Sequence, residues 1–131
     1  MAHLQEIVDA SNLPVNADFG SGFAADAAGV EVNVGLAIKT GVAGVSIEDA
    51  TGKADKALYD IDTAVGRIRA ARMAIDKAGG DTLLVGRAEC YLVGQPDLDE
   101  TILRLKLYAE AGADCLYAPG ITTKQQIAAV V

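Results

Sequence analysis

Charged side chains close three apolar, β-rich segments of this 131-residue sequence. Asp18 ends the first segment, Glu48 and Asp49 end the second, and Arg87, soon followed by Glu89, ends the third. Packing gives a buried strand no reason to finish in a carboxylate, since charged side chains are rarely buried without a partner. The carboxyl ends of parallel strands share one edge of a sheet, where α/β proteins bind ligands. We therefore expect these charged groups to gather in one site.

This set of side chains suits the chemistry of small acids. Two carboxylates on neighbouring strand ends are suitable ligands for Mg²⁺, a hard cation that prefers oxygen and keeps several waters. Arg87, one strand further on, would then face a substrate carboxylate or phosphonate with its bidentate fork. A metal together with an arginine is what the stabilisation of a 2-oxo acid enolate requires. The pattern indicates a metal-assisted reaction on a small acid.

Each of these residues also has a structural interpretation. Asp18 and Asp49 could cap turns, because aspartate side chains accept hydrogen bonds from nearby backbone amides. Arg87 could be a structural partner for Glu48 or Glu89. The sequence leaves both alternatives open.

The glycine-rich turn, the two cysteines and the histidine are weaker candidates for a catalytic or binding role. Gly20-Ser21-Gly22 is neither a P-loop nor a full dinucleotide-binding fingerprint, so a plain turn is favoured. Cys90 lies just past a strand end with no base in view, and Cys115 lies within a predicted strand, where core packing is expected. The only histidine, His3, stands near the start of the chain and is expected to be exposed. The sequence therefore predicts no histidine-based acid–base chemistry.

The elements that must position the charged groups alternate between strand and helix. The apolar runs are typical of parallel strands buried on both faces, and their spacing of about 30 to 40 residues is that of one βα unit. The pattern predicts an α/β fold. Strands are predicted at 13–18, 44–49, 82–87 and 113–118, and helices at 27–39, at 61–75 with a stop at 79–80, at 97–111, and near both ends of the chain.

Length and composition narrow the class of protein. A chain of 131 residues is enough for one domain. No apolar run approaches the roughly 20 residues of a membrane span, and the N-terminus lacks the basic and apolar regions of a signal peptide. The net charge of −7 disfavours nucleic acids and anionic membranes as partners, because both are bound by basic patches. The two cysteines make no disulfide framework, and we expect a cytoplasmic protein.

Six segments of the chain follow an ordered set of motifs. They are LPVNADFGSGF at 13–23, GVSIED at 44–49, GRAE at 86–89, YLVGQPDLDETI at 91–102, AEAGAD at 109–114 and YAPG at 117–120. Together they resemble the isocitrate lyase/phosphoenolpyruvate mutase family. The corresponding family patterns begin with PV-x-AD-x-E-x-G-Y/F-G, G-V-x-I-E-D and A-R-T-D/E. The six segments occur in the order of the family motifs and together cover nearly the whole chain.

The resemblance implies a fold of the TIM (β/α)₈-barrel type. A complete barrel takes about 250 residues. Residues 1–131 would form a single partial barrel domain of about four parallel βα units, matching roughly strands three to six. The last helical segment, which stops at Val130-Val131 without a cap, agrees with a partial barrel. Open strand edges on such a domain predict a homo-oligomer.

The resemblance also implies roles for the charged residues. Asp18 would be the direct Mg²⁺ ligand, and Glu48 a carboxylate of the metal's water shell. Arg87 would hold the acid group of the substrate, so Arg87 and Glu48 are the predicted catalytic residues. Gly20 and Ser21 join Arg87 as predicted substrate contacts. Family members act next to a 2-oxo acid group through an enolate or pyruvyl intermediate, and include isocitrate and methylisocitrate lyases, oxaloacetate hydrolases, phosphoenolpyruvate mutase and phosphonopyruvate hydrolase.

The sequence departs from the family pattern at three points. Gly20 replaces the second acidic residue of the first motif, which removes one outer-shell carboxylate. The loop 50–60 lacks the Lys-Lys-Cys-Gly-His lid of the lyases, so isocitrate lyase activity is not expected. Counterparts of the family's first two strands are absent.

Three function hypotheses follow. The first is an enzyme, or part of one, that uses Mg²⁺ on a small 2-oxo acid, dicarboxylate or phosphonate. The second is a catalytically inactive barrel fragment that folds by self-association. The third, an open-sheet binding domain of the flavodoxin-like kind, ranks last because the sequence has no phosphate loop.

Overall fold

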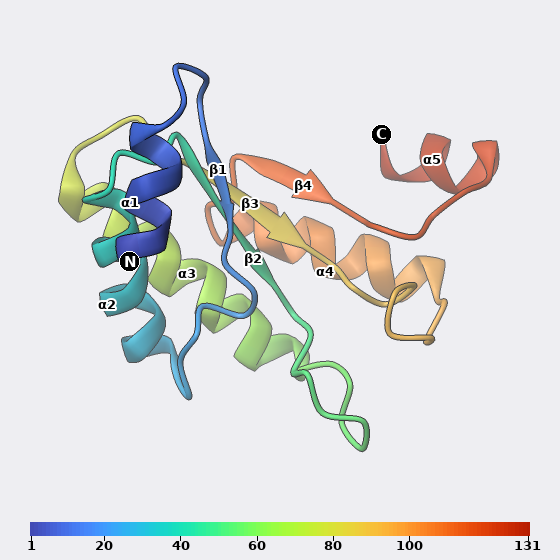
Figure 1. Ribbon diagram of the computed structural model, residues 1–131. Helices are drawn as coiled ribbons and strands as arrows, with labels where there is room; N and C mark the ends of the chain where they lie inside the picture. The colour runs from blue at the N-terminus through green and yellow to red at the C-terminus, as the bar shows by residue number, and fades with distance from the viewer.

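Four parallel strands form one sheet in the computed structural model, which describes all residues 1–131 (Figure 1). They are β1 (Asn16–Asp18), β2 (Gly44–Glu48), β3 (Leu83–Arg87) and β4 (Cys115–Tyr117). Each strand is hydrogen-bonded to the next in chain order, β1-β2-β3-β4, and every pair is parallel. The predicted strand–helix alternation is confirmed.

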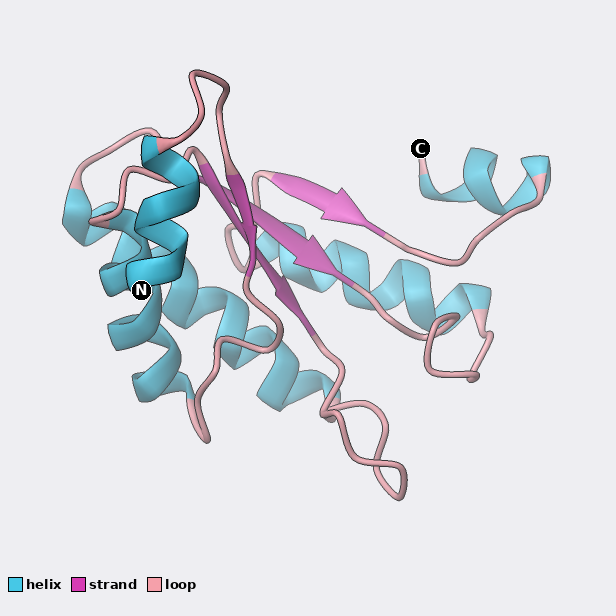
Figure 2. Cartoon of the chain, viewed as in Figure 1, coloured by secondary structure: helices cyan, strands magenta, loops and turns pink.

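The helices that connect the strands all lie on one face of this sheet (Figure 2). They are α2 (Ala27–Ile38), α3 (Ile61–Ala78) and α4 (Leu98–Glu110), while α1 (Ala2–Asp9) lies beside β1 and α5 (Lys124–Val130) lies beyond β4. A doubly wound sheet carries helices on both faces and reverses its strand order. Sequential order with helices on one face is the arrangement of neighbouring units in a barrel. The flavodoxin-like hypothesis is therefore wrong.

Aspartate caps set the starts of all three connecting helices. The side chains of Asp26, Asp60 and Asp97 accept hydrogen bonds from backbone amides three residues ahead, at 2.8, 2.9 and 3.0 Å. Such a cap replaces a hydrogen bond that the first turn of a helix cannot make internally. At the other end, α3 stops at Gly79, whose φ of +69° is the left-handed conformation expected of a helix-ending glycine.

The core fills the space between the sheet and the connecting helices. Val45 and Ile47 on β2 and Leu84 on β3 are fully buried there, and Ile68 and Ile75 of α3 pack in the same cluster. Burying one such side chain contributes about 1.5–3 kcal/mol. Burial of this cluster stabilises the packing of the helices against this face of the sheet.

The opposite face of the sheet carries no covering layer in this chain. All three residues of β4 are exposed, so the prediction of strands buried on both faces is wrong for this strand. Cys115 is exposed instead of packed in the core, because only the helix side of the sheet is covered. All four strands are shorter than predicted, β2 and β3 by one residue and β1 and β4 by three. Strand β1 begins at Asn16, after Pro14, which has no amide hydrogen to donate to a ladder.

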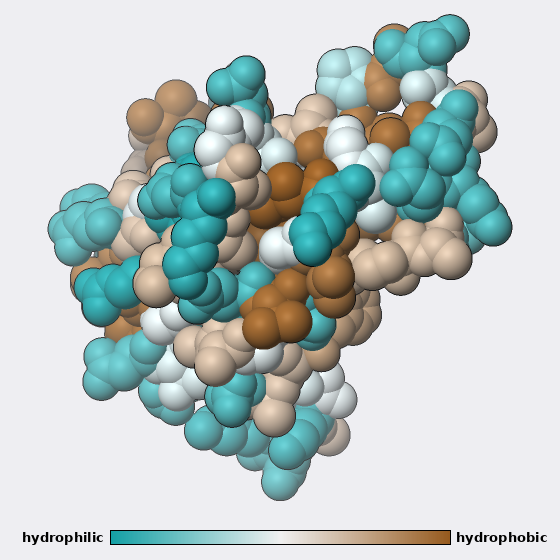
Figure 3. Space-filling view, turned by 90° about the vertical axis from the view of Figure 1, so that its left-hand side faces the viewer, coloured by the Kyte–Doolittle hydropathy of each residue, from teal (hydrophilic) through white to brown (hydrophobic).

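The surface mixes apolar and polar groups. Figure 3, which looks at the side where α1 and α2 lie, shows apolar patches between hydrophilic side chains. Exposed apolar residues include Ile7, Phe23 and Val32. No helix is both long enough and apolar enough to cross a membrane.

Two glycine substitutions test how tightly the loop after β1 is built. Gly22 has a φ of +91°, and a Cβ there would lie 2.7 Å from a methyl group of the buried Val30. We expect Gly22→Ala to lower the free energy of unfolding by about 1–3 kcal/mol. Gly66→Ala is the control, since Gly66 lies within α3 with nothing near its added Cβ, and it should raise stability by about 0.5–1 kcal/mol. Urea unfolding measures both, and equal effects would contradict the expectation.

Candidate active site

Strand register brings the predicted site residues together on the uncovered face of the sheet. Glu48 lies opposite Arg87, and Asp18 ends the neighbouring strand. A Cβ on Gly86 would lie 3.0 Å from the Cβ of Tyr108 in α4, so position 86 faces the helices. Side chains alternate along a strand, and Arg87 therefore points to the other face. The expectation that these charges gather at one site is met.

Arg87 binds three carboxylates at once. Its Nη1 lies 2.9 Å from Asp18 Oδ2, its Nη2 lies 3.7 Å from Glu48 Oε2, and its Nε donates to Glu89 Oε1 at 2.9 Å. The guanidinium also lies over the Tyr117 ring, 5.5 Å from the ring centre. We call Asp18, Glu48 and Glu89, with Arg87 among them, the carboxylate cluster. The structural alternative for Arg87 is confirmed and extended, because Asp18 joins the two predicted partners.

The carboxylate cluster has more negative than positive charge. Burial, and then the charge of Glu89, raises the pKa of Glu48. Burial also raises the pKa of Glu89, whose side chain is only 5% exposed, although Arg87 opposes the shift. For Arg87, burial would lower the pKa, but the hydrogen bond and charge of Glu89 raise it. Three carboxylates face one guanidinium, and this excess of acidic groups favours the approach of a further cation.

Asp49 faces the opposite way from its neighbour Glu48 and is 1% exposed. Its carboxylate accepts hydrogen bonds from the Glu89 amide at 2.8 Å, from Arg104 Nη1 at 3.0 Å and from the Tyr108 hydroxyl at 2.6 Å. Burial and the charge of Asp49 raise the pKa of Tyr108, so the hydroxyl stays a donor. Asp49 is not a turn cap. It joins the ends of β2 and β3 to α4.

Sequence reasoning missed Arg104 and Tyr108 because both lie within an ordinary amphipathic helix. They are four residues apart, so they share one face of α4, and both are buried. The available signal was a cation and a phenol on the apolar face of a predicted helix. A buried cation and a buried phenol need an acidic hydrogen-bond acceptor, and Asp49 is that acceptor.

Arg67 of α3 is a second buried arginine that the sequence did not reveal. It is 1% exposed and donates to the carbonyls of Ser21, Ala24 and Ala25, at 2.7, 3.1 and 2.8 Å. Its guanidinium lies over the Tyr59 ring at 4.2 Å. Arg67 thereby holds the loop between β1 and α2 against the loop between β2 and α3.

Gly20 and Ser21, the predicted substrate contacts, lie in the first of these loops. The Gly20 carbonyl accepts from the Glu48 amide at 3.0 Å, and its own amide points to Asp18 Oδ1 at 3.4 Å. Gly20 has a φ of +49°, and an added Cβ would meet nothing within 4 Å. The family's acidic residue at this position is replaced by open space beside the carboxylate cluster. Contact of Gly20 and Ser21 with a substrate stays a prediction.

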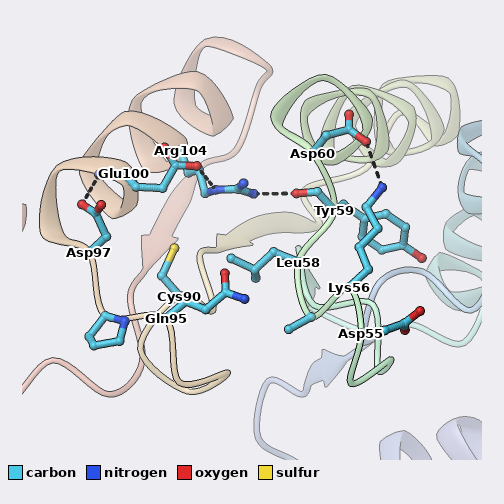
Figure 4. A pocket seen from close by; sticks show the side chains of 12 residues that line it. Asp55, Lys56, Leu58, Tyr59, Asp60, Cys90, Gln95, Asp97, Glu100 and Arg104 are labelled. Atoms are coloured by element: carbon cyan, nitrogen blue, oxygen red, sulfur yellow. Dashed lines mark hydrogen bonds and ion pairs between the residues drawn. The ribbon is translucent and has the colours of Figure 1, made fainter.

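The largest cavity lies between the loops that follow β2 and β3, and Figure 4 shows it from close by. It has a volume of about 680 Å³, and none of Asp18, Glu48 and Arg87 lines it. Arg104 reaches from its wall to the Tyr59 carbonyl at 3.1 Å. Cys90 also lines the cavity, and burial raises the pKa of its thiol, which makes it a poor nucleophile. The reactive arrangement is therefore the carboxylate cluster and not this cavity.

The carboxylate cluster offers oxygen donors of the kind that Mg²⁺ prefers. No group of three or more His, Cys, Asp and Glu side chains forms a ready-made metal site. Mg²⁺ keeps several waters and is usually held through one or two carboxylates. Asp18 and Glu48 supply two such carboxylates, both already arranged around a cation, Arg87. The surplus negative charge of the cluster fits a divalent ion better than it fits the single charge of Arg87.

Comparison with known proteins establishes the family. The family model for phosphoenolpyruvate phosphomutase matches residues 1–131. The chain belongs to the phosphoenolpyruvate mutase family, as the ordered motifs predicted, and its fold is of the α/β type found in the barrels of that family.

Relatives and solved structures agree with this assignment. The chain is 34% identical to 2-methylisocitrate lyase of Escherichia coli K12, over 93% of this chain and 42% of the relative. A provisionally assigned lyase/mutase from Burkholderia cenocepacia J2315 superposes with a TM-score of 0.95 at 47% identity, over 98% of this chain and 46% of that protein. Phosphonopyruvate hydrolase in complex with oxalate and Mg²⁺ superposes with a TM-score of 0.82 at 28% identity, over 96% and 44%. The chain thus spans less than half the length of these proteins.

The Asp49 network gives a stability prediction. In Arg104→Met, the buried Asp49 loses its charged partner, and we expect the free energy of unfolding to fall by about 3–5 kcal/mol. Arg69→Met removes the same charge from an exposed position on α3 and should change stability by at most about 0.5 kcal/mol. Urea unfolding compares the two variants. A loss below about 1 kcal/mol in Arg104→Met would show that Asp49 does not depend on Arg104.

Proposed function

We propose that this chain carries the acid- and metal-binding part of a Mg²⁺-dependent lyase or mutase. Its substrate would be a small 2-oxo acid, dicarboxylate or phosphonate, transformed through an enolate or pyruvyl intermediate. The single observation that supports this most is the convergence of Asp18, Glu48 and Arg87 at the carboxyl ends of adjacent parallel strands. Membership of the phosphoenolpyruvate mutase family supports the same class of reaction.

Each residue of the site has a proposed role. Asp18 would hold Mg²⁺ directly, because its carboxylate is the most exposed of the three at 67%. Glu48 would accept hydrogen bonds from the water shell of the ion. When bound, Mg²⁺ supplies positive charge where a substrate oxygen becomes negative. Arg87 would bind the acid group of the substrate through its planar fork, and the Gly20-Ser21 turn would contact the substrate beside Asp18.

The identity of the relatives and the charge of the cluster support this substrate class. The relatives include 2-methylisocitrate lyase and phosphonopyruvate hydrolase, whose substrates are small acids. Acid groups of this kind are bound by cationic groups. A cluster with surplus negative charge binds such an anion only weakly until a metal ion has reversed the local field. This physical requirement favours Mg²⁺ as part of the site. The cytoplasmic location stays a prediction.

Two features of the sheet favour the second hypothesis, a barrel fragment that folds by self-association. Leu83 on β3 and Tyr117 on β4 are 50% and 52% exposed on the uncovered side of the sheet. Strands β1 and β4 also leave their outer edges unpaired. Exposed edges and apolar side chains of this kind favour pairing with a second chain.

Ligand-dependent melting tests the proposed enzyme site. We expect millimolar Mg²⁺ together with oxalate, an analogue of the pyruvate enolate, to raise the melting temperature by about 5 °C or more once both ligands are well above their Kd. Asp18→Ala and Arg87→Ala should abolish the shift, while Arg69→Ala, far from the cluster, should keep it. No shift in the unmodified chain would contradict a working acid and metal site.

Light scattering tests self-association. We expect dimers or larger assemblies at micromolar concentration, because burying the apolar side chains of the open face is favourable. Leu83→Lys should move the chain toward monomers by placing a charge on that face. Val32→Lys, on the exposed side of α2, is the matched control and should not. A monomeric unmodified chain would refute the expectation.

A further inference from the structure

We propose that Arg87 acts as an internal cation that competes with the metal ion for Asp18 and Glu48, and becomes free for an acid ligand only when the metal displaces it. This inference rests on the proposed function, since it concerns the order in which the same site fills. In the absence of an acid ligand, Arg87 thereby weakens the binding of the metal ion.

The competition follows from the atoms that Arg87 already uses. Its Nη1 contacts Asp18 and its Nη2 faces Glu48, at 2.9 and 3.7 Å. Those two carboxylates are the proposed metal-binding groups. The same two nitrogens form the end of the fork that would grip a carboxylate or phosphonate. Arg87 therefore cannot serve an incoming acid fully while it serves Asp18 and Glu48.

The three partners of Arg87 differ in how firmly they are held. Glu89 is 5% exposed at its side chain and binds Nε at 2.9 Å. Its backbone amide is in turn fixed by Asp49 at 2.8 Å. Asp18, in contrast, is 67% exposed, so its carboxylate can turn toward water at small cost. The bond to Glu89 is the one that stays, and the bond to Asp18 is the one that breaks.

Glu89 is therefore a positioning residue for Arg87. With Nε held, the guanidinium keeps its place above the Tyr117 ring while Nη1 and Nη2 change partners. A divalent ion at Asp18 and Glu48 would repel Arg87 and also remove the negative charge that attracts it. Metal and acid then bind with positive coupling, since each favours the same arrangement of Arg87.

Metal titration without any acid tests the competition. Isothermal titration calorimetry with Mg²⁺ alone should show that Arg87→Gln binds the ion about tenfold more tightly than the unmodified chain, because the competing cation is gone. Arg69→Gln loses the same charge from an exposed site on α3 and should bind Mg²⁺ within about twofold of the unmodified chain. Circular dichroism confirms that each variant is folded.

A second variant tests the competition by measuring the binding of an acid in the absence of metal. Asp18→Asn removes the partner charge of Nη1 at an exposed position, so the fold should persist. Oxalate alone should then bind about fivefold more tightly than to the unmodified chain, because Arg87 is partly released. If Arg87→Gln fails to fold, this oxalate measurement alone tests whether Arg87 is held by Asp18.

The outcomes separate the inference from the proposed function. If Mg²⁺ binds the unmodified chain but no more tightly to Arg87→Gln, or if Asp18→Asn gains no oxalate affinity, the competition is refuted and the metal site stands. If neither Mg²⁺ nor oxalate binds the unmodified chain or any variant, the proposed function fails and the inference fails with it.

Discussion

The buried carboxylate of Asp49 is the contact on which the geometry of the site depends. It accepts one hydrogen bond from the backbone just after β3 and two from side chains of α4, at 2.6–3.0 Å. Removing a carboxylate from water is costly, and only a full set of charged and polar donors offsets that cost. Because these donors come from separate elements, the ends of β2 and β3 are held in one relative position. Glu48 precedes Asp49 in the chain, and the amide of Glu89 donates to Asp49. The network therefore also sets the positions of Glu48 and Glu89.

Two buried arginines support the loops around the site in different ways. Arg104 pairs with the carboxylates of Asp49 and Glu100 and also donates to the Tyr59 carbonyl. Arg67 binds backbone carbonyls of the β1–α2 loop and stacks on the Tyr59 ring. Tyr59 thus connects the two arginines through its carbonyl and its ring. These contacts consequently hold the turn that carries Gly20 and Ser21 in a fixed position relative to the strand ends.

The carboxylate cluster is held together by Arg87, which neutralises only part of its negative charge. Arg87 reduces repulsion among Asp18, Glu48 and Glu89, which allows three carboxylates to approach one another at the strand ends. Burial raises the pKa values of Glu48 and Glu89, and Arg87 opposes both shifts. A site of this charge would bind small anionic substrates poorly unless a further cation joined it. The relatives of the chain act on such acids, and the charge balance gives a physical reason for the metal dependence that we propose.

The sequence by itself determined the order of strands and helices, their approximate bounds and the position of charged residues after the strands. These features are local: apolar periodicity, the aspartate that precedes each connecting helix and the glycine at position 79 act within a few residues. Tertiary structure decided which charges meet. Asp49 and Arg104 are 55 residues apart, and Arg87 and Asp18 are 69 apart, so no local pattern could pair them. It also decided that β4 and Cys115 are exposed, because burial depends on which face of the sheet other elements cover, and a strand's own residues do not contain that information.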